Sequence, residues 1–91
     1  MFDNVVRPRE QKKTYRCPCC KFKTLYGRSH YELCPVCYWE DDGQDEHDAG
    51  EVRGGPNGSL SLHEAQSNFR NFGAMEEQFK SKVRKPYTDE L

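Results

Sequence analysis

Two Cys-x-x-Cys clips, CPCC at residues 17–20 and CPVC at residues 34–37, constrain the fold of this chain more than any other feature. In such a clip a tight turn lets both sulfurs point at one ion, and the proline after the first cysteine pre-sets the turn. The thirteen residues between the clips are enough for a hairpin that brings them face to face. We therefore predict a tetrahedral metal site whose ligands are Cys17, Cys20, Cys34 and Cys37.

Zinc is the metal that we expect at this site, as one structural ion. A tetrahedral tetrathiolate suits both zinc and iron, but the apolar shell that would tune an iron site is sparse in this sequence. Four cysteine ligands fill the tetrahedron and leave no position for a reacting water, which argues for a structural role. Metal binding would then supply much of the folding free energy.

A fifth cysteine, Cys19, lies inside the first clip. Two interpretations of it stay open. In the first, Cys19 is a spectator thiol at the tip of the turn. In the second, it is a redox-sensitive thiol or an alternative metal ligand, because a thiol beside a metal clip reacts more readily than an ordinary one.

The composition explains why a chain like this needs a metal. Its 91 residues suffice for one small domain, and they are 34% hydrophobic against 32% charged. The hydrophobic core is therefore small and needs additional stabilisation, such as a bound metal. An odd number of cysteines argues against a complete disulfide framework, and the N-terminal MFDNVVRPRE lacks the apolar run of a secretion signal. No stretch approaches the roughly 18 apolar residues of a membrane span. We expect a cytoplasmic protein, with no membrane partner, in which the cysteines hold metal.

The pattern along the chain predicts a small α+β domain over residues 15–85, with a flexible basic arm at 1–14 and a tail at 86–91. FKTLY (22–26) and YEL (31–33) alternate apolar and polar residues and are predicted to form a zinc-ribbon-like β-hairpin. Residues 40–58 hold seven acids and five glycines and are predicted to form a long loop.

A helix is predicted to begin at Ser61, because SLHE fits a capping box in which Ser61 and Glu64 each satisfy the other's backbone N–H. Gly73 is well placed to end it. A shorter second helix is expected over 74–84, with apolar residues at every fourth position. The predicted core has eight apolar members: Phe22, Leu25, Leu33, Trp39, Leu60, Leu62, Phe69 and Phe72.

The charge is unevenly distributed along the chain. Eight Lys or Arg and one acid lie between Arg7 and Arg28, whereas seven acids and no Lys or Arg lie between Glu40 and Glu51. The two stretches either complement each other across the fold or remain solvated. A basic half is also typical of nucleic-acid binding, and the candidate contacts around the first clip are Arg16, Lys21, Lys23 and Arg28.

Four motifs together give this sequence a resemblance that covers residues 15–74: CPCC at 17–20, CPVCYWEDDGQ at 34–44, GGPNGSLSLHEA at 54–65 and NFRNFGA at 68–74. With them the chain resembles the bacterial cysteine-rich CPCC family. The resemblance implies a metal-binding, zinc-ribbon-like protein whose acidic loop is packed and whose Trp39 covers the metal clip. Lys21 follows the first clip where family members often have glycine, and lysine would be strained if that position has a positive φ.

The function that we expect is a structural-zinc module that binds another protein or acts as an accessory factor. Nucleic-acid binding through the basic residues around the first clip is the alternative. A second alternative is a metal-dependent enzyme that uses the loop carboxylates or an open metal position.

Overall fold

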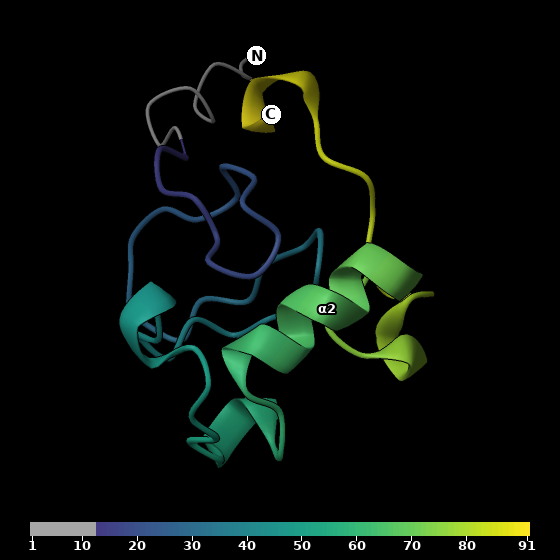
Figure 1. Cartoon of the computed structure of the whole chain (residues 1–91). Helices are drawn as coiled ribbons and strands as arrows, with labels where there is room; N and C mark the ends of the chain where they lie inside the picture. Colours follow the sequence, from purple (N-terminus) through teal and green to yellow (C-terminus); the bar gives the residue numbers. More distant parts are fainter. Residues whose placement is uncertain (1–12) are drawn as a thin grey trace.

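The computed structural model describes residues 13–91, so all but Lys13 and Thr14 of the predicted basic arm lies outside the described residues. Over these residues it is a small compact domain with one α-helix, α2 (Leu62–Phe72), which lies against a mostly irregular half that carries the cysteines (Figure 1). Four single-turn 3-10 helices complete the described part: η1 (Glu46–Asp48), η2 (Gly55–Asn57), η3 (Glu77–Phe79) and η4 (Thr88–Glu90). None of the helices within residues 13–91 has the length and apolar character needed to cross a membrane.

The predicted β-hairpin is not confirmed, because residues 13–91 contain isolated bridges in place of strands. The antiparallel bridges join Tyr15 to Leu25, Leu33 to Glu40 and Val52 to Ser61. Leu25 and Leu33 belong to the two segments that were expected to pair, yet each pairs with a residue on the far side of its own clip. The two alternating apolar segments therefore close the two clips separately and do not pair with each other.

Helix α2 forms as its sequence predicts. The Ser61 hydroxyl accepts a hydrogen bond from the Glu64 N–H, and the Glu64 carboxylate accepts one from the Ser61 N–H. Such an N-cap contributes about 1 kcal/mol. At the other end Gly73 adopts a left-handed conformation, with φ 82°, and donates its N–H to the Phe69 carbonyl. Leu62 and Ala65 are the buried residues of the helix.

The second helix predicted over 74–84 is wrong, since one 3-10 turn, η3, is its only helical part. The backbone there is bonded to other parts of the molecule. Met75 donates its N–H to the Cys37 carbonyl at 2.7 Å and accepts from the Asn68 side chain at 2.9 Å. The Phe79 ring stacks on Tyr38 with the ring centres 4.5 Å apart. These contacts with the second clip and with its neighbour Tyr38 replace the backbone hydrogen bonds of a regular helix.

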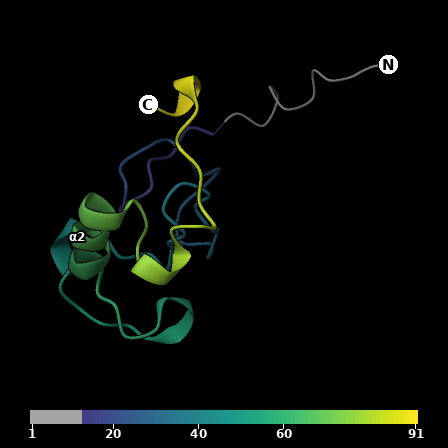
Figure 2. The same cartoon turned by 90° about the vertical axis from the view of Figure 1, so that its right-hand side faces the viewer.

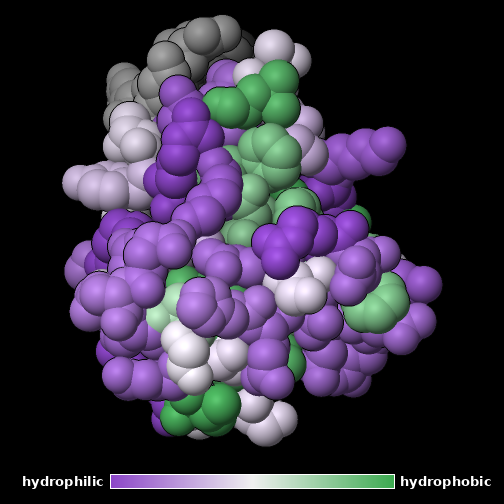
Figure 3. Space-filling model, in the orientation of Figure 1, coloured by the Kyte–Doolittle hydropathy of each residue, from purple (hydrophilic) through white to green (hydrophobic). Residues whose placement is uncertain are grey.

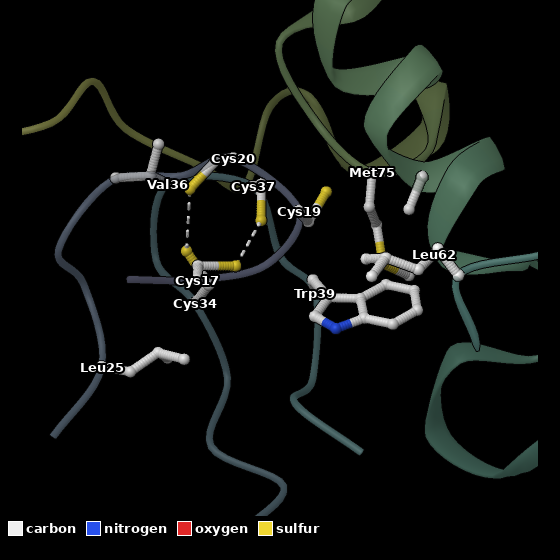
Figure 4. Packing of buried hydrophobic residues seen from close by; sticks show 12 residues of the cluster. Cys17, Cys19, Cys20, Leu25, Cys34, Val36, Cys37, Trp39, Leu62 and Met75 are labelled. Carbon is white, nitrogen blue, oxygen red and sulfur yellow. Dashed lines mark hydrogen bonds between the residues drawn. The ribbon is translucent and has the colours of Figure 1, made fainter. Parts of the chain in front are cut away.

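All five cysteines lie in the core (Figure 4). Of the predicted core, Leu25, Trp39 and Leu62 are fully buried, while Phe22, Leu60 and Phe69 pack against the cluster and are partly buried. The prediction was wrong for Leu33 and Phe72, which remain 42% and 39% exposed. The cysteines occupy the centre of a domain with few buried residues, so these two apolar side chains find no second layer to cover them. The outer face drawn in Figure 3 is mainly hydrophilic, with hydrophobic residues in small separate areas.

The acidic loop is packed, as the family resemblance implied. Asp41 is completely buried and accepts hydrogen bonds from Arg28 Nε at 2.6 Å and from the Ser29 N–H at 2.8 Å. The Asn57 side chain exchanges two hydrogen bonds with the Glu40 backbone, at 2.7 and 3.1 Å. The basic and acidic stretches therefore complement each other at Arg28. The hydrogen bonds of Asn57 hold the GGPN segment against the WEDDGQ segment.

Residues 85–91, which include the whole predicted tail, run back toward the start of the described chain (Figures 1 and 2). The Glu90 carbonyl accepts the Lys23 N–H at 2.7 Å, and its buried carboxylate accepts a bidentate pair of hydrogen bonds from Arg84 at 2.8 and 3.0 Å. Lys13 adds a third cationic contact at 3.3 Å. The segment thus packs on the cysteine-bearing half.

Candidate metal centre

The two clips have the same backbone hydrogen-bond pattern. In the first, the Cys17 N–H donates to the Phe22 carbonyl at 2.9 Å and the Cys17 carbonyl accepts from Lys21 at 2.8 Å. In the second, the Cys34 N–H donates to Trp39 at 2.9 Å and its carbonyl accepts from Tyr38 at 2.8 Å. Each clip is therefore a closed turn that holds its two cysteine side chains on one side. The sequence spacing alone predicted this local geometry.

The residue that follows each clip has a left-handed backbone conformation. Lys21 has φ 71° and Tyr38 has φ 76°. This conformation costs a residue with a Cβ roughly 1–2 kcal/mol. The positive φ that was expected to strain Lys21 is therefore present, and Tyr38 repeats it in the second clip.

The structure brings the four cysteines of the two clips together. Their Sγ atoms all lie within 4.8 Å of one another, and all four residues are buried. Two contacts join the clips: Cys17 Sγ to Cys37 Sγ at 3.6 Å and Cys20 Sγ to Cys34 Sγ at 3.7 Å (Figure 4). In a tetrahedron with metal–sulfur bonds near 2.3 Å the sulfurs are about 3.8 Å apart. The observed separations fit that arrangement, so the four cysteines could hold one metal ion.

Crowding of the sulfurs shifts their pKa values in opposite directions. Contacts with the Cys20 and Cys34 sulfurs raise the pKa of Cys17 far above that of an ordinary thiol, and burial raises the pKa of Cys37. The pKa of Cys34 is instead lowered, first by Cys17 and Cys20 and also by the Thr24 hydroxyl, whose oxygen is 3.0 Å from the Cys34 sulfur. Four thiolates this close together in a buried site need a cation among them.

Cys19 is not one of the four clustered cysteines, although its side chain contacts Cys37 and raises the pKa of that thiol. It is 4% exposed and belongs to the same apolar cluster, but its sulfur lies to one side of the four clustered sulfurs in Figure 4. The group that could hold a metal does not include it. Both interpretations of this residue stay predictions.

The four predicted nucleic-acid contacts have different surroundings. Lys21 is paired with Glu46 at 2.6 Å, and Arg28 is paired with Asp41 and Asp45. Arg16 donates to the carbonyl oxygens of Lys21 and Leu91. Within residues 13–91, neither Arg16 nor Lys23 is paired with an Asp or Glu side chain. Acidic neighbours thus neutralise two of the four charges.

Three contacts from the C-terminal half support the clip backbones, and sequence reasoning missed all three. Gln66 of α2 donates its side-chain amide to the Pro18 carbonyl at 2.8 Å, across 48 residues of sequence. Met75 donates to Cys37, as described above, and Arg84 donates its N–H to the Pro35 carbonyl at 3.1 Å. Two of these donors are backbone groups, so no side-chain pattern could have revealed them. They join the helix and the C-terminal segment to both clips.

Comparison with known proteins agrees with this geometry. The family model described as Cysteine-rich CPCC matches residues 15–90, which extends from the bridge residue Tyr15 through both clips to the buried Glu90. Searches of curated proteins and of solved structures gave no match. Because the matched range covers most of the chain and includes the four clustered cysteines, this protein belongs to the cysteine-rich CPCC family.

Proposed function

We propose that this protein is a small cytosolic zinc-binding module in which Cys17, Cys20, Cys34 and Cys37 hold one structural zinc ion. The observation that carries the proposal is the buried group of four sulfurs, all within 4.8 Å of one another. Soft thiolate ligands in a tetrahedral arrangement suit zinc. Iron has the same ligand preference, and the identity of the metal is therefore the first quantity to measure.

A structural role follows from the ligand count. Four thiolates complete the coordination of zinc, so the ion has no open position at which a water or a substrate could react. The site also links parts of the chain that are far apart, since Met75 and Arg84 donate to the second clip and Gln66 donates to the first. A zinc ion there would fix both clips and, through them, α2 and the C-terminal segment. This supports a non-enzymatic role.

We propose further that the module binds another protein. A closed metal site leaves the surface as the functional part of the molecule, and that surface carries large exposed side chains. Tyr26, Tyr31 and Tyr87 are each more than half exposed. Tyrosine is enriched in protein interfaces because it offers a large contact area together with a polar group. Nucleic-acid binding stays the alternative and would depend on Arg16 and Lys23, which are not paired with Asp or Glu side chains within the described residues.

Native mass spectrometry of protein purified without added metal tests the central claim. We expect one zinc ion per chain, and X-ray absorption should show four sulfur neighbours with no lighter ligand. Fully reduced, folded protein without metal would contradict the proposal, and an oxygen or nitrogen ligand would reopen the enzymatic alternative. Titration of labelled nucleic acid at low salt separates the two binding roles, since phosphate contacts give a strongly salt-dependent affinity.

A further inference from the structure

Two sulfur–sulfur contacts join the clips, and each contact takes one cysteine from each clip. Cys17 contacts Cys37 at 3.6 Å, and Cys20 contacts Cys34 at 3.7 Å. A disulfide requires a sulfur–sulfur distance of about 2.05 Å. An approach of roughly 1.6 Å would therefore join either pair.

We propose that this centre is also a peroxide-sensitive switch, in which oxidation joins Cys20 to Cys34 and Cys17 to Cys37 and releases the metal. The proposal rests on the proposed function, since it concerns the regulation of the same site. It assigns the disulfides between the clips and none within a clip. The chain would respond to oxidant by losing the ion that holds its two clips together.

The chemistry balances with a peroxide as the oxidant. The Cys20 thiolate attacks one peroxide oxygen, which gives a sulfenic acid and one hydroxide ion. The Cys34 thiolate then attacks the Cys20 sulfur, forms the S–S bond and displaces a second hydroxide. Each disulfide thus consumes one hydrogen peroxide and removes two ligands. A second peroxide oxidises Cys17 and Cys37 in the same way. No thiolate then remains at the site to hold an ion.

Exposure sets the order of the two steps. Cys20 is 7% exposed, whereas Cys17, Cys34 and Cys37 are completely buried. Peroxide therefore reaches Cys20 first, and the Cys20–Cys34 pair is oxidised before the Cys17–Cys37 pair. Cys19 is 4% exposed and lies beside the four clustered sulfurs (Figure 4). With both inter-clip pairs complete, Cys19 remains as the odd reduced thiol.

Stepwise addition of hydrogen peroxide to the reduced, metal-loaded full chain tests the switch. A chromophoric chelator reports the released metal, and peptide mapping after alkylation of free thiols reports the pairing. We expect one ion released per chain, the Cys20–Cys34 disulfide before Cys17–Cys37, and alkylated Cys19. Disulfides within a clip, a disulfide of Cys19, or metal retained at peroxide levels that fully oxidise free glutathione would each overturn the proposal.

Two controls separate this proposal from the proposed function. Metal content measured before peroxide is added tests the proposed function by itself. A loaded chain that keeps its metal or pairs its cysteines differently leaves the zinc site intact and removes the switch. The matched variant Cys19→Ser should release its metal at the same peroxide concentration and give the same two disulfides. A changed pairing in this variant would show that Cys19 takes part in the exchange and would overturn the assignment.

Discussion

Arg84 and Glu90 form a bidentate ion pair, with nitrogen–oxygen distances of 2.8 and 3.0 Å, that closes the C-terminal segment on itself. The Glu90 carboxylate is buried and also accepts the Tyr87 N–H at 2.8 Å. Arg84 in turn donates its backbone N–H to Pro35 in the second clip. One carboxylate therefore connects the end of the chain to the candidate metal centre.

Glu90 should make the stability of the protein depend on pH in the acidic range. The Arg84 guanidinium, with help from Tyr87 and Lys13, lowers the pKa of Glu90 to about 2, below its ordinary value near 4.3. The carboxylate therefore contributes its full stabilisation above about pH 4.5 and loses it as the pH falls toward 2. We expect Glu90→Gln to lower the free energy of unfolding by about 2 kcal/mol at pH 7.

The difference between wild type and Glu90→Gln, measured by denaturant unfolding, should shrink steadily from pH 5 to pH 3. Using the difference removes the effect of acid on the cysteines, since both proteins share it. A difference that is constant across this range would mean that the Glu90 carboxylate does not titrate with the pKa that its partners give it.

The four clip cysteines and Cys19 should respond oppositely to substitution by serine. Cys34→Ser removes one of four ligands, and we expect the metal content to fall at least tenfold with loss of the compact fold, because a structural ion supplies folding free energy. Cys19→Ser, the matched control in the same core, should keep full metal content. Metal analysis and circular dichroism check both, and loss of metal from Cys19→Ser would change the ligand assignment.

Replacement of Lys21 by glycine should stabilise the first clip. Lys21 is exposed and has φ 71°, so glycine would relieve roughly 1–2 kcal/mol of backbone strain. Greater freedom of glycine in the unfolded chain offsets about 0.5–1 kcal/mol of that gain. The exposed contact with Glu46 is lost as well, and an ion pair this exposed contributes little to stability.

Lys21→Ala is the matched control, because it loses the same side chain and keeps the strain. We expect Lys21→Gly to unfold at a higher temperature than Lys21→Ala in the metal-loaded state. The reverse order would show that the turn does not store strain at this position.

Asp41 should matter more to stability than any exposed acid of the same loop. Its buried carboxylate accepts hydrogen bonds from Arg28, Ser29 and Gly43. Asp41→Asn removes the charge that compensates Arg28, and we expect a loss of roughly 2–4 kcal/mol. Glu51→Gln, at an exposed position in the same loop, should change stability by less than about 0.5 kcal/mol. Thermal unfolding of the two variants checks the contrast, and similar values would contradict it.

Features that depend on neighbouring residues could be predicted from the sequence. The spacing of Cys17, Cys20, Cys34 and Cys37 predicted two similar turns and the group of sulfurs that they form. Ser61, Glu64 and Gly73 predicted the ends of α2, because capping involves groups within a few residues of each other. The departure from glycine at Lys21 predicted strain at a position that has a positive φ.

Tertiary structure decided whatever depends on which distant group a backbone atom meets. The segments containing Leu25 and Leu33 alternate as strands do, yet each closes its own clip. The segment after Gly73 has helical spacing, but the Met75 N–H bonds to the Cys37 carbonyl. Leu33 and Phe72 were expected in the core, but the centre is filled by cysteines. In a domain with so few buried side chains, contacts with the clips outweigh the local secondary-structure preference of a segment. The sequence of that segment alone does not show which of the two effects is stronger.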